Sequence, residues 1–252
     1  MFLDRLFGKS EYDGQNQIRE AGTAEKASAF ITALLVLFIL LTTATQALCF
    51  WIPNWWRNEY AKYDTPSNVR GEMSLDDAVS ITEDMLNYCV GRLDTLDDSM
   101  ATIDGVTAPF YTDREKQHLS DCRVLFHKGL RARAISILLS VGLLIFIYVH
   151  LGGRGTMRLM ASAYLKALAS VLLIAVIVAI AAAVDFTRAF TIFHKIFFDN
   201  DLWILYPEQD NLINIMQEDV FSDAAIWIGG MWAGACAALA ALSVYVLKRD
   251  SK

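Results

Sequence analysis

The chain has 252 residues, of which 55% are hydrophobic and 20% are charged, and its formal net charge is −6 at pH 7. The hydrophobic residues gather in long blocks between polar stretches, which is typical of a membrane protein and not of a soluble globular domain. The acidic balance, without any basic stripe, argues against nucleic acid as a partner. Four scattered cysteines argue against a disulfide scaffold or a zinc finger.

The chain begins with a polar segment, residues 1–26, in which Asp4–Phe7 is a candidate for a short amphipathic piece on a membrane surface. An apolar run follows at residues 27–52 and is long enough to cross a bilayer as a helix. The polar lead and the apolar run are both too long for a cleaved signal peptide. We therefore predict a first transmembrane helix, and we expect an interfacial aromatic belt formed by Trp51, Trp55 and Trp56.

Residues 53–133 form the longest polar region, which we predict to be a small, mainly helical cap. Ser74 is a candidate N-cap, and the apolar residues after it recur at the spacing of an amphipathic helix. Residues 94–109 are expected to form a loop that turns at Asp104-Gly105.

The end of this cap carries the most informative stretch, Phe110–Cys122. Thr112 and Glu115 have the spacing of a capping box, which predicts a helix that begins here. Glu115, His118 and Asp121 then share one face of that helix. Carboxylates on both sides of a histidine would orient its ring and raise its basicity, as a general base requires. The alternative interpretation is a solvated helix face with one exposed histidine.

Three further apolar runs predict three more transmembrane helices, at residues 134–151, 159–186 and 223–247. The glycines of the short link 152–158 are interpreted as a turn, because no strand precedes them as a phosphate-binding loop requires. Residues 187–222 form a second, aromatic loop, and residues 248–252 form a tail.

Four spans place both termini on one side of the membrane. Basic residues flank the spans on that side, which is therefore expected to be cytoplasmic, with the cap and the aromatic loop outside. The supporting residues are Lys26, Arg154, Arg158, Lys248 and Arg249, and the opposing ones are Lys128, Arg131 and Arg133.

The cysteines allow two interpretations. Cys89 and Cys122 lie in the extracytoplasmic cap, where a disulfide between them would be stable, and they are equally well explained as reduced residues packed in the core. Cys49 and Cys236 lie in predicted spans and are expected to be packing residues only.

The aromatic loop carries a second histidine, His194, on the same helical face as Phe190 and Phe197. An incidental histidine in an aromatic belt is the alternative explanation. Both His118 and His194 fall on the outer side, where they would suit acid–base chemistry on a lipid ester. They would equally suit zinc binding together with Glu115 or Asp121. No serine lies in a nucleophile elbow, which argues against a serine hydrolase.

Several motifs, in this order and spacing, resemble the lipoprotein intramolecular transacylase family of Gram-positive bacteria. They are Met85–Tyr88, Phe110–Asp121, and Phe193–Phe198 with Trp203 and Pro207. The resemblance implies an intramolecular acyltransferase that moves the sn-2 acyl chain of an S-diacylglyceryl-cysteine lipoprotein to the N-terminal cysteine amine. The product would be the lyso form of the lipoprotein, and two histidines at the boundary between cap and membrane would carry the chemistry.

The sequence thus predicts an all-α membrane protein with four transmembrane helices and a small, mainly helical extracytoplasmic cap. We expect a monomer in the bacterial cell membrane that acts on diacylglyceryl-modified lipoproteins and membrane lipid, without a metal or another cofactor. The alternatives are a metal-dependent membrane lipid hydrolase and a non-catalytic lipoprotein-binding scaffold. The predicted site consists of His118 and His194 as catalytic residues, Tyr111, Glu115 and Asp121 as supporting residues, and Phe110, Phe190, Phe193, Phe197 and Trp203 as substrate contacts.

Overall fold

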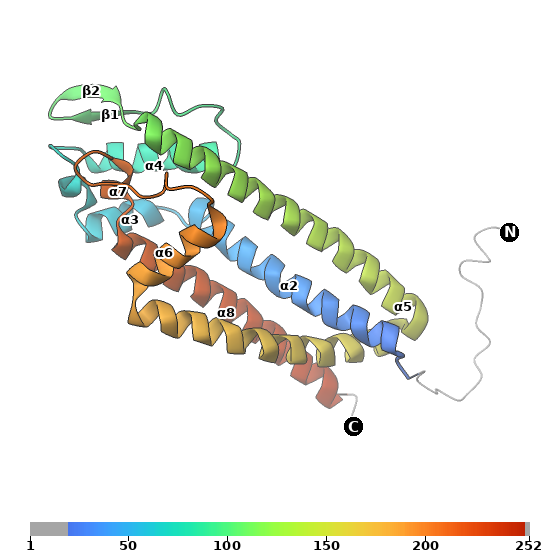
Figure 1. The fold of residues 1–252 in the computed structure, drawn as a ribbon. Helices are drawn as coiled ribbons and strands as arrows, with labels where there is room; N and C mark the ends of the chain where they lie inside the picture. Colours follow the sequence, from blue (N-terminus) through green and yellow to red (C-terminus); the bar gives the residue numbers. More distant parts are fainter. Residues whose placement is uncertain (1–19, 250–252) are drawn as a thin grey trace.

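The protein is described here by a computed structural model of residues 20–249 (Figure 1). The amphipathic piece predicted at Asp4–Phe7 lies outside these residues. Three of the described helices are long and apolar enough to cross a membrane: α2 (Thr23–Phe50), α5 (Asp113–Val184) and α8 (Glu218–Arg249). The protein is therefore an all-α membrane protein in its fold class, as predicted.

Helix α5 contains one break, at Gly152, where φ is 67° and ψ is 178°. A positive φ suits glycine, which has no Cβ to clash with the backbone. The two arms of α5 run in opposite directions from this bend (Figure 1). The predicted turn is therefore present, but helix resumes directly after Gly152 and no loop spans residues 152–158. The first arm also joins the cap to the second apolar run without interruption.

Small residues allow α2, α5 and α8 to pack closely. Ala33 and Leu37 of α2 lie in one buried cluster with Ala167 of α5 and Trp232 of α8. The Trp232 indole N–H donates to the carbonyl of Leu37 at 3.0 Å. The opposite faces of these helices carry exposed apolar side chains, as expected for surfaces that contact lipid chains; examples are Leu138, Val149 and Val184.

The cap is built from short elements around the start of α5 (Figure 1). They are α3 (Trp55–Lys62), the 3₁₀ turn η1 (Thr65–Asn68), α4 (Leu75–Cys89), the strands β1 (Met100–Ile103) and β2 (Val106–Pro109), α6 (Phe186–Phe197) and α7 (Leu212–Ile215). Ser74 caps α4 as predicted, because its hydroxyl accepts the N–H of Asp77 at 3.0 Å.

Two predictions for the cap need correction. Residues 100–109 form an antiparallel hairpin where a loop was expected, and positive φ angles at Asp104 and Gly105 give the tight turn that joins its strands. Trp55 is only 4% exposed and packs inside the cap, so it does not belong to an interfacial belt; Trp51, at 57% exposure, fits that role.

The core of the cap joins segments that are far apart in the sequence. Leu119 of α5 packs with Ile81 and Met85 of α4 and with Leu212 and Ile215 of α7. The region predicted as a second loop is therefore not independent, because its α7 segment inserts into the cap. This docking fixes the start of α5 and the chain that follows α6 in one unit.

Candidate active site: two histidines beneath the cap

The first turn of α5 is held by the predicted capping box. The Thr112 N–H donates to Glu115 Oε2 at 2.6 Å, and the Glu115 N–H donates to the Thr112 hydroxyl at 3.3 Å. The other carboxylate oxygen of Glu115 accepts the N–H of Leu212, which ties α5 to α7. Burial raises the pKa of Glu115, and the backbone N–H donors partly oppose that shift. Glu115 is therefore a positioning residue and makes no hydrogen bond to His118 among the described residues.

The chain that carries the second histidine is fixed against α5 as well. Asn200 donates to the Asp121 carboxylate at 2.9 Å, and the Arg114 guanidinium donates to the carbonyls of Asp201 and Ile204, each at 3.0 Å. Asp121, predicted as a supporting residue, thus holds the segment after α6 and does not bond the ring of His118. This anchoring places Trp203 over His194, where the two rings stack with centroids 4.9 Å apart.

The two histidines meet beneath the cap. The centroids of the His118 and His194 rings are 6.0 Å apart, and the ring planes meet at 36°. The two residues are only 6% and 8% exposed. The ring of Phe198 lies 5.2 Å from His118 and 5.6 Å from His194, and that of Phe190 lies 4.1 Å from His194. The structure therefore brings together two imidazoles that are 76 positions apart in the chain.

His194 has its tautomer fixed by the backbone. Its Nδ1 lies 2.8 Å from the carbonyl oxygen of Phe190, one helical turn earlier. A carbonyl only accepts hydrogen bonds, so Nδ1 carries the proton and Nε2 of the neutral ring is an acceptor. Burial lowers the pKa of His194, and the bond to Phe190 partly opposes this shift. His194 is thus a neutral ring with one nitrogen ready to take a proton.

His118 has the opposite arrangement. Its Nε2 lies 3.6 Å from Sγ of Cys122. Burial raises the pKa of that thiol to about 12, so the thiol keeps its proton and can donate it to Nε2. With the thiol as donor, the proton of the neutral His118 ring is on Nδ1, and this buried nitrogen has no hydrogen-bond partner among residues 20–249. In this tautomer His118 presents an unused N–H donor.

The pKa of His118 is lowered to about 4, mainly by burial and then by His194, with Asp121 opposing. Of the two flanking carboxylates that were predicted to raise the basicity of His118, only Asp121 does so, and burial together with His194 outweighs its effect. Glu115 uses its oxygens on backbone N–H groups and Asp121 accepts from Asn200, so neither carboxylate bonds the imidazole. A low pKa makes His118 a neutral donor and a poor base.

Cys122 is the contact that the sequence analysis missed. The sequence predicts Cys122 only as a disulfide partner or as a packing residue, and both Cys122 and Cys89 are free thiols in the structure. The signal was its position four residues after His118, which on a helix brings the two side chains together.

The remaining predicted residues divide into two groups. Phe110 is 2% exposed within the core of the cap, so its assignment as a substrate contact is corrected to a packing role. Tyr111 donates to the carbonyl of Ile81 at 2.7 Å and supports the cap from the same core. Phe193 and Phe197 are 46% and 49% exposed on α6, so their rings are open to a ligand. No group of three metal-binding side chains occurs in the described part of the chain.

Comparisons with known proteins give consistent results. The model of the family described as "Lipoprotein intramolecular transacylase Lit" matches residues 30–221. The fold resembles the in meso structure of the membrane integral transacylase Lit from Bacillus cereus, with 18% identity and a TM-score of 0.73, covering 92% of this chain and 99% of the other. A variant of the B. cereus protein, in which a histidine is replaced by arginine, matches at 17% identity and a TM-score of 0.66, covering 90% and 93%. A search of curated proteins found no match.

Proposed function

The chain belongs to the lipoprotein intramolecular transacylase family and is an acyltransferase, and on this premise we propose its reaction. It transfers the sn-2 acyl chain of an S-diacylglyceryl-cysteine lipoprotein to the amine of the same N-terminal cysteine. The C–O bond of the sn-2 ester breaks and a C–N amide bond forms. The amine loses one proton and the glycerol oxygen gains one, so the reaction needs no water and no other co-reactant.

One observation carries the assignment of roles: two buried imidazoles lie 6.0 Å apart, and their nitrogens have different partners. His194 Nδ1 faces a backbone carbonyl, whereas His118 Nδ1 has no partner within the described residues. His194 Nε2 takes the proton from the attacking amine and returns it to the leaving sn-2 oxygen. Nδ1–H of His118 donates a hydrogen bond to the oxyanion that develops on the ester carbonyl. The low pKa of His118 keeps its ring neutral near pH 7. A neutral imidazole still carries one N–H, which can donate to the oxyanion.

Much of the catalysis in this proposal comes from positioning. The amine and the ester belong to one flexible molecule, and holding them in contact contributes up to about 7–11 kcal/mol in favourable cases. Phe190, Phe193, Phe197 and Trp203 supply an aromatic surface around His194 for the glyceryl group and its chains. Burial of both histidines keeps water away from the ester, which favours attack by the amine.

We further propose that the enzyme is a monomer whose chain crosses the bacterial cell membrane four times, with each arm of α5 counted as one crossing. The start of α2, the bend of α5 and the end of α8 lie at the end of the bundle away from the cap (Figure 1). This end carries Lys26, Arg154, Arg158, Lys248 and Arg249, and an excess of basic residues favours a cytoplasmic location. The cap then faces the extracytoplasmic side, where lipoproteins reside.

The test is mass spectrometry of a reporter lipoprotein made in cells with His118→Ala or His194→Ala enzyme. We expect each variant to lower lyso-lipoprotein formation by at least about 100-fold while the protein still accumulates in the membrane. His150→Ala is the matched control, because His150 lies far along α5 next to Phe146. Full activity of either variant would remove that histidine from the mechanism.

The same assay separates the other candidate functions. A metal-dependent hydrolase would release free fatty acid and would lose activity with a chelator, whereas the proposed transacylase releases no acid and keeps its activity. A scaffold protein would retain its cellular role in a variant that lacks both histidines.

A further inference from the structure

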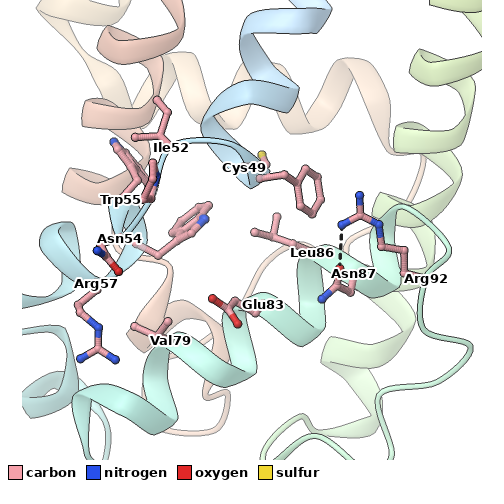
Figure 2. Close-up of a pocket in the computed structure, with 13 residues that line it drawn as sticks. Cys49, Ile52, Asn54, Trp55, Arg57, Val79, Glu83, Leu86, Asn87 and Arg92 are labelled. Atoms are coloured by element: carbon pink, nitrogen blue, oxygen red, sulfur yellow. Dashed lines mark hydrogen bonds between the residues drawn. The ribbon is translucent and has the colours of Figure 1, made fainter.

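A cavity of about 360 Å³ lies apart from the histidine pair, between α4 and the turn that joins α2 to α3 (Figure 2). It is lined by the last turn of α2, by residues 52–57 and by one face of α4, and neither histidine belongs to its walls. Phe50 ends the apolar helix α2, and the neighbouring Trp51 is exposed. The cavity therefore lies at the depth where lipid chains give way to headgroups.

The wall of this cavity contains two unused hydrogen-bond donors. The indole N–H groups of Trp55 and Trp56 are both buried, and neither has an acceptor among residues 20–249. Leaving a buried N–H without a partner costs about 1–3 kcal/mol. Either indole would have to turn toward the cavity to reach a ligand oxygen, and the hydrogen bond formed there would remove this cost.

The charged side chains around the cavity are also unbalanced. Within the described residues, the only hydrogen bond of the Arg92 guanidinium goes to the neutral amide of Asn87, at 3.3 Å (Figure 2). The guanidinium also lies over the ring of Phe50, 4.7 Å from its centroid. Glu83 projects from α4 toward the α2–α3 turn, is exposed, and makes no hydrogen bond or ion pair within the described residues. By contrast, Arg57 on the same rim is paired with Asp76. One cation and one anion thus face this cavity without a charged partner.

We propose that this cavity binds the headgroup of a zwitterionic aminophospholipid, with its phosphate toward Arg92 and the indole N–H groups and its ammonium toward Glu83. The aromatic rings of the wall favour an ammonium group through cation–π attraction. A purely anionic headgroup fits less well, because its phosphate would leave the Glu83 carboxylate without a cation. The site is distinct from the proposed catalytic one.

Native mass spectrometry of the purified full-length protein in detergent, titrated with dioleoyl phosphatidylethanolamine or dioleoyl phosphatidylglycerol, tests this proposal. We expect the wild type to bind the ethanolamine lipid about tenfold more tightly than the glycerol lipid. Glu83→Gln should remove this preference, and Arg92→Gln should weaken both lipids about tenfold. Asp98→Asn and Arg131→Gln control for general charge effects, and His118→Ala should bind like the wild type, which separates this site from catalysis.

Three outcomes would overturn the proposal. One is equal affinity of the wild type for the two lipids, and another is unchanged affinity in both pocket variants. The third is displacement of the lipid by free phosphoethanolamine at the lipid's own concentration, or by a delipidated lipoprotein peptide, since either would assign the cavity to a soluble ligand.

Discussion

Where the start of α5 meets α4 and α7, the core of the cap treats buried polar groups in the opposite way to the neighbouring histidine pair. In the core, Glu115 accepts two backbone N–H groups, Tyr111 donates to Ile81, and Asn214 donates to the carbonyls of Pro207 and Asp210, both at 3.0 Å. One helical turn after Glu115, His118 keeps a buried ring nitrogen, Nδ1, without any partner in the described chain.

This difference separates what holds the fold from what is left for chemistry. A buried polar group is costly unless it is bonded, so a satisfied group stabilises the fold and an unsatisfied one is retained for another reason. Near neutral pH, changes in the cap core should therefore act on stability, and changes at the histidine pair should act on the reaction. Four predictions test this separation.

The largest effect is expected from Glu115→Ala. The substitution leaves the N–H groups of Thr112 and Leu212 without acceptors and frees α7 from α5, so we expect the free energy of unfolding to fall by about 4 kcal/mol. Thermal or denaturant unfolding in detergent measures this change. Glu115→Gln keeps one acceptor oxygen and should lose less than half as much; equal losses would show that charge, and not bonding, is what matters.

The second effect concerns pH and His118. The folded-state pKa is about 4 and the ordinary value is 6.5, so the unfolded chain binds a proton first as the pH falls. Above pH 6.5, His118 should therefore not lower the free energy of unfolding. Between pH 6.5 and 4 it should lower that free energy progressively, by up to roughly 3 kcal/mol. The difference in unfolding free energy between the wild type and His118→Phe measures it. A difference that does not change with pH would contradict the lowered pKa.

The third effect is on rate alone. Cys122→Ala removes the thiol that lies 3.6 Å from His118 Nε2 and that we propose as its donor, so the ring can change tautomer and lose its Nδ1–H. We expect about a tenfold lower kcat with an unchanged KM and little change in stability, measured by lyso-lipoprotein formation in detergent. Cys122→Ser retains a donor and should recover most of the rate. If Ala and Ser behave alike, Cys122 has only a packing role.

The smallest effect is on substrate binding. Phe197→Ala removes an exposed ring from α6, next to Phe193, and we expect KM to rise about fivefold, or roughly 1 kcal/mol, at constant kcat. Ile137→Ala is the control, because it shortens an exposed apolar side chain on α5 away from the histidines. An equal change in both variants would indicate a general effect of lipid contact.

Local sequence patterns predicted many features of the chain. Length and apolar content predicted the spanning helices, and the spacing of Thr112 and Glu115 predicted the cap at the start of α5. These features depend on contacts within a few residues, so short stretches of sequence contain the necessary information. The hairpin at residues 100–109 was missed because its strands are only four residues each, although its turn was predicted.

The tertiary structure decided everything that depends on contacts between distant segments. The sequence by itself indicated that His118 and His194 are unusual, but only the docking of α7 and of residues 199–204 onto α5 placed their rings together. It also directed Glu115 and Asp121 to other partners, buried Phe110 and Trp55, and placed Cys122 against His118. Periodicity along one helix shows which side chains share a face, whereas the groups that reach that face from elsewhere determine how each one ionises and bonds.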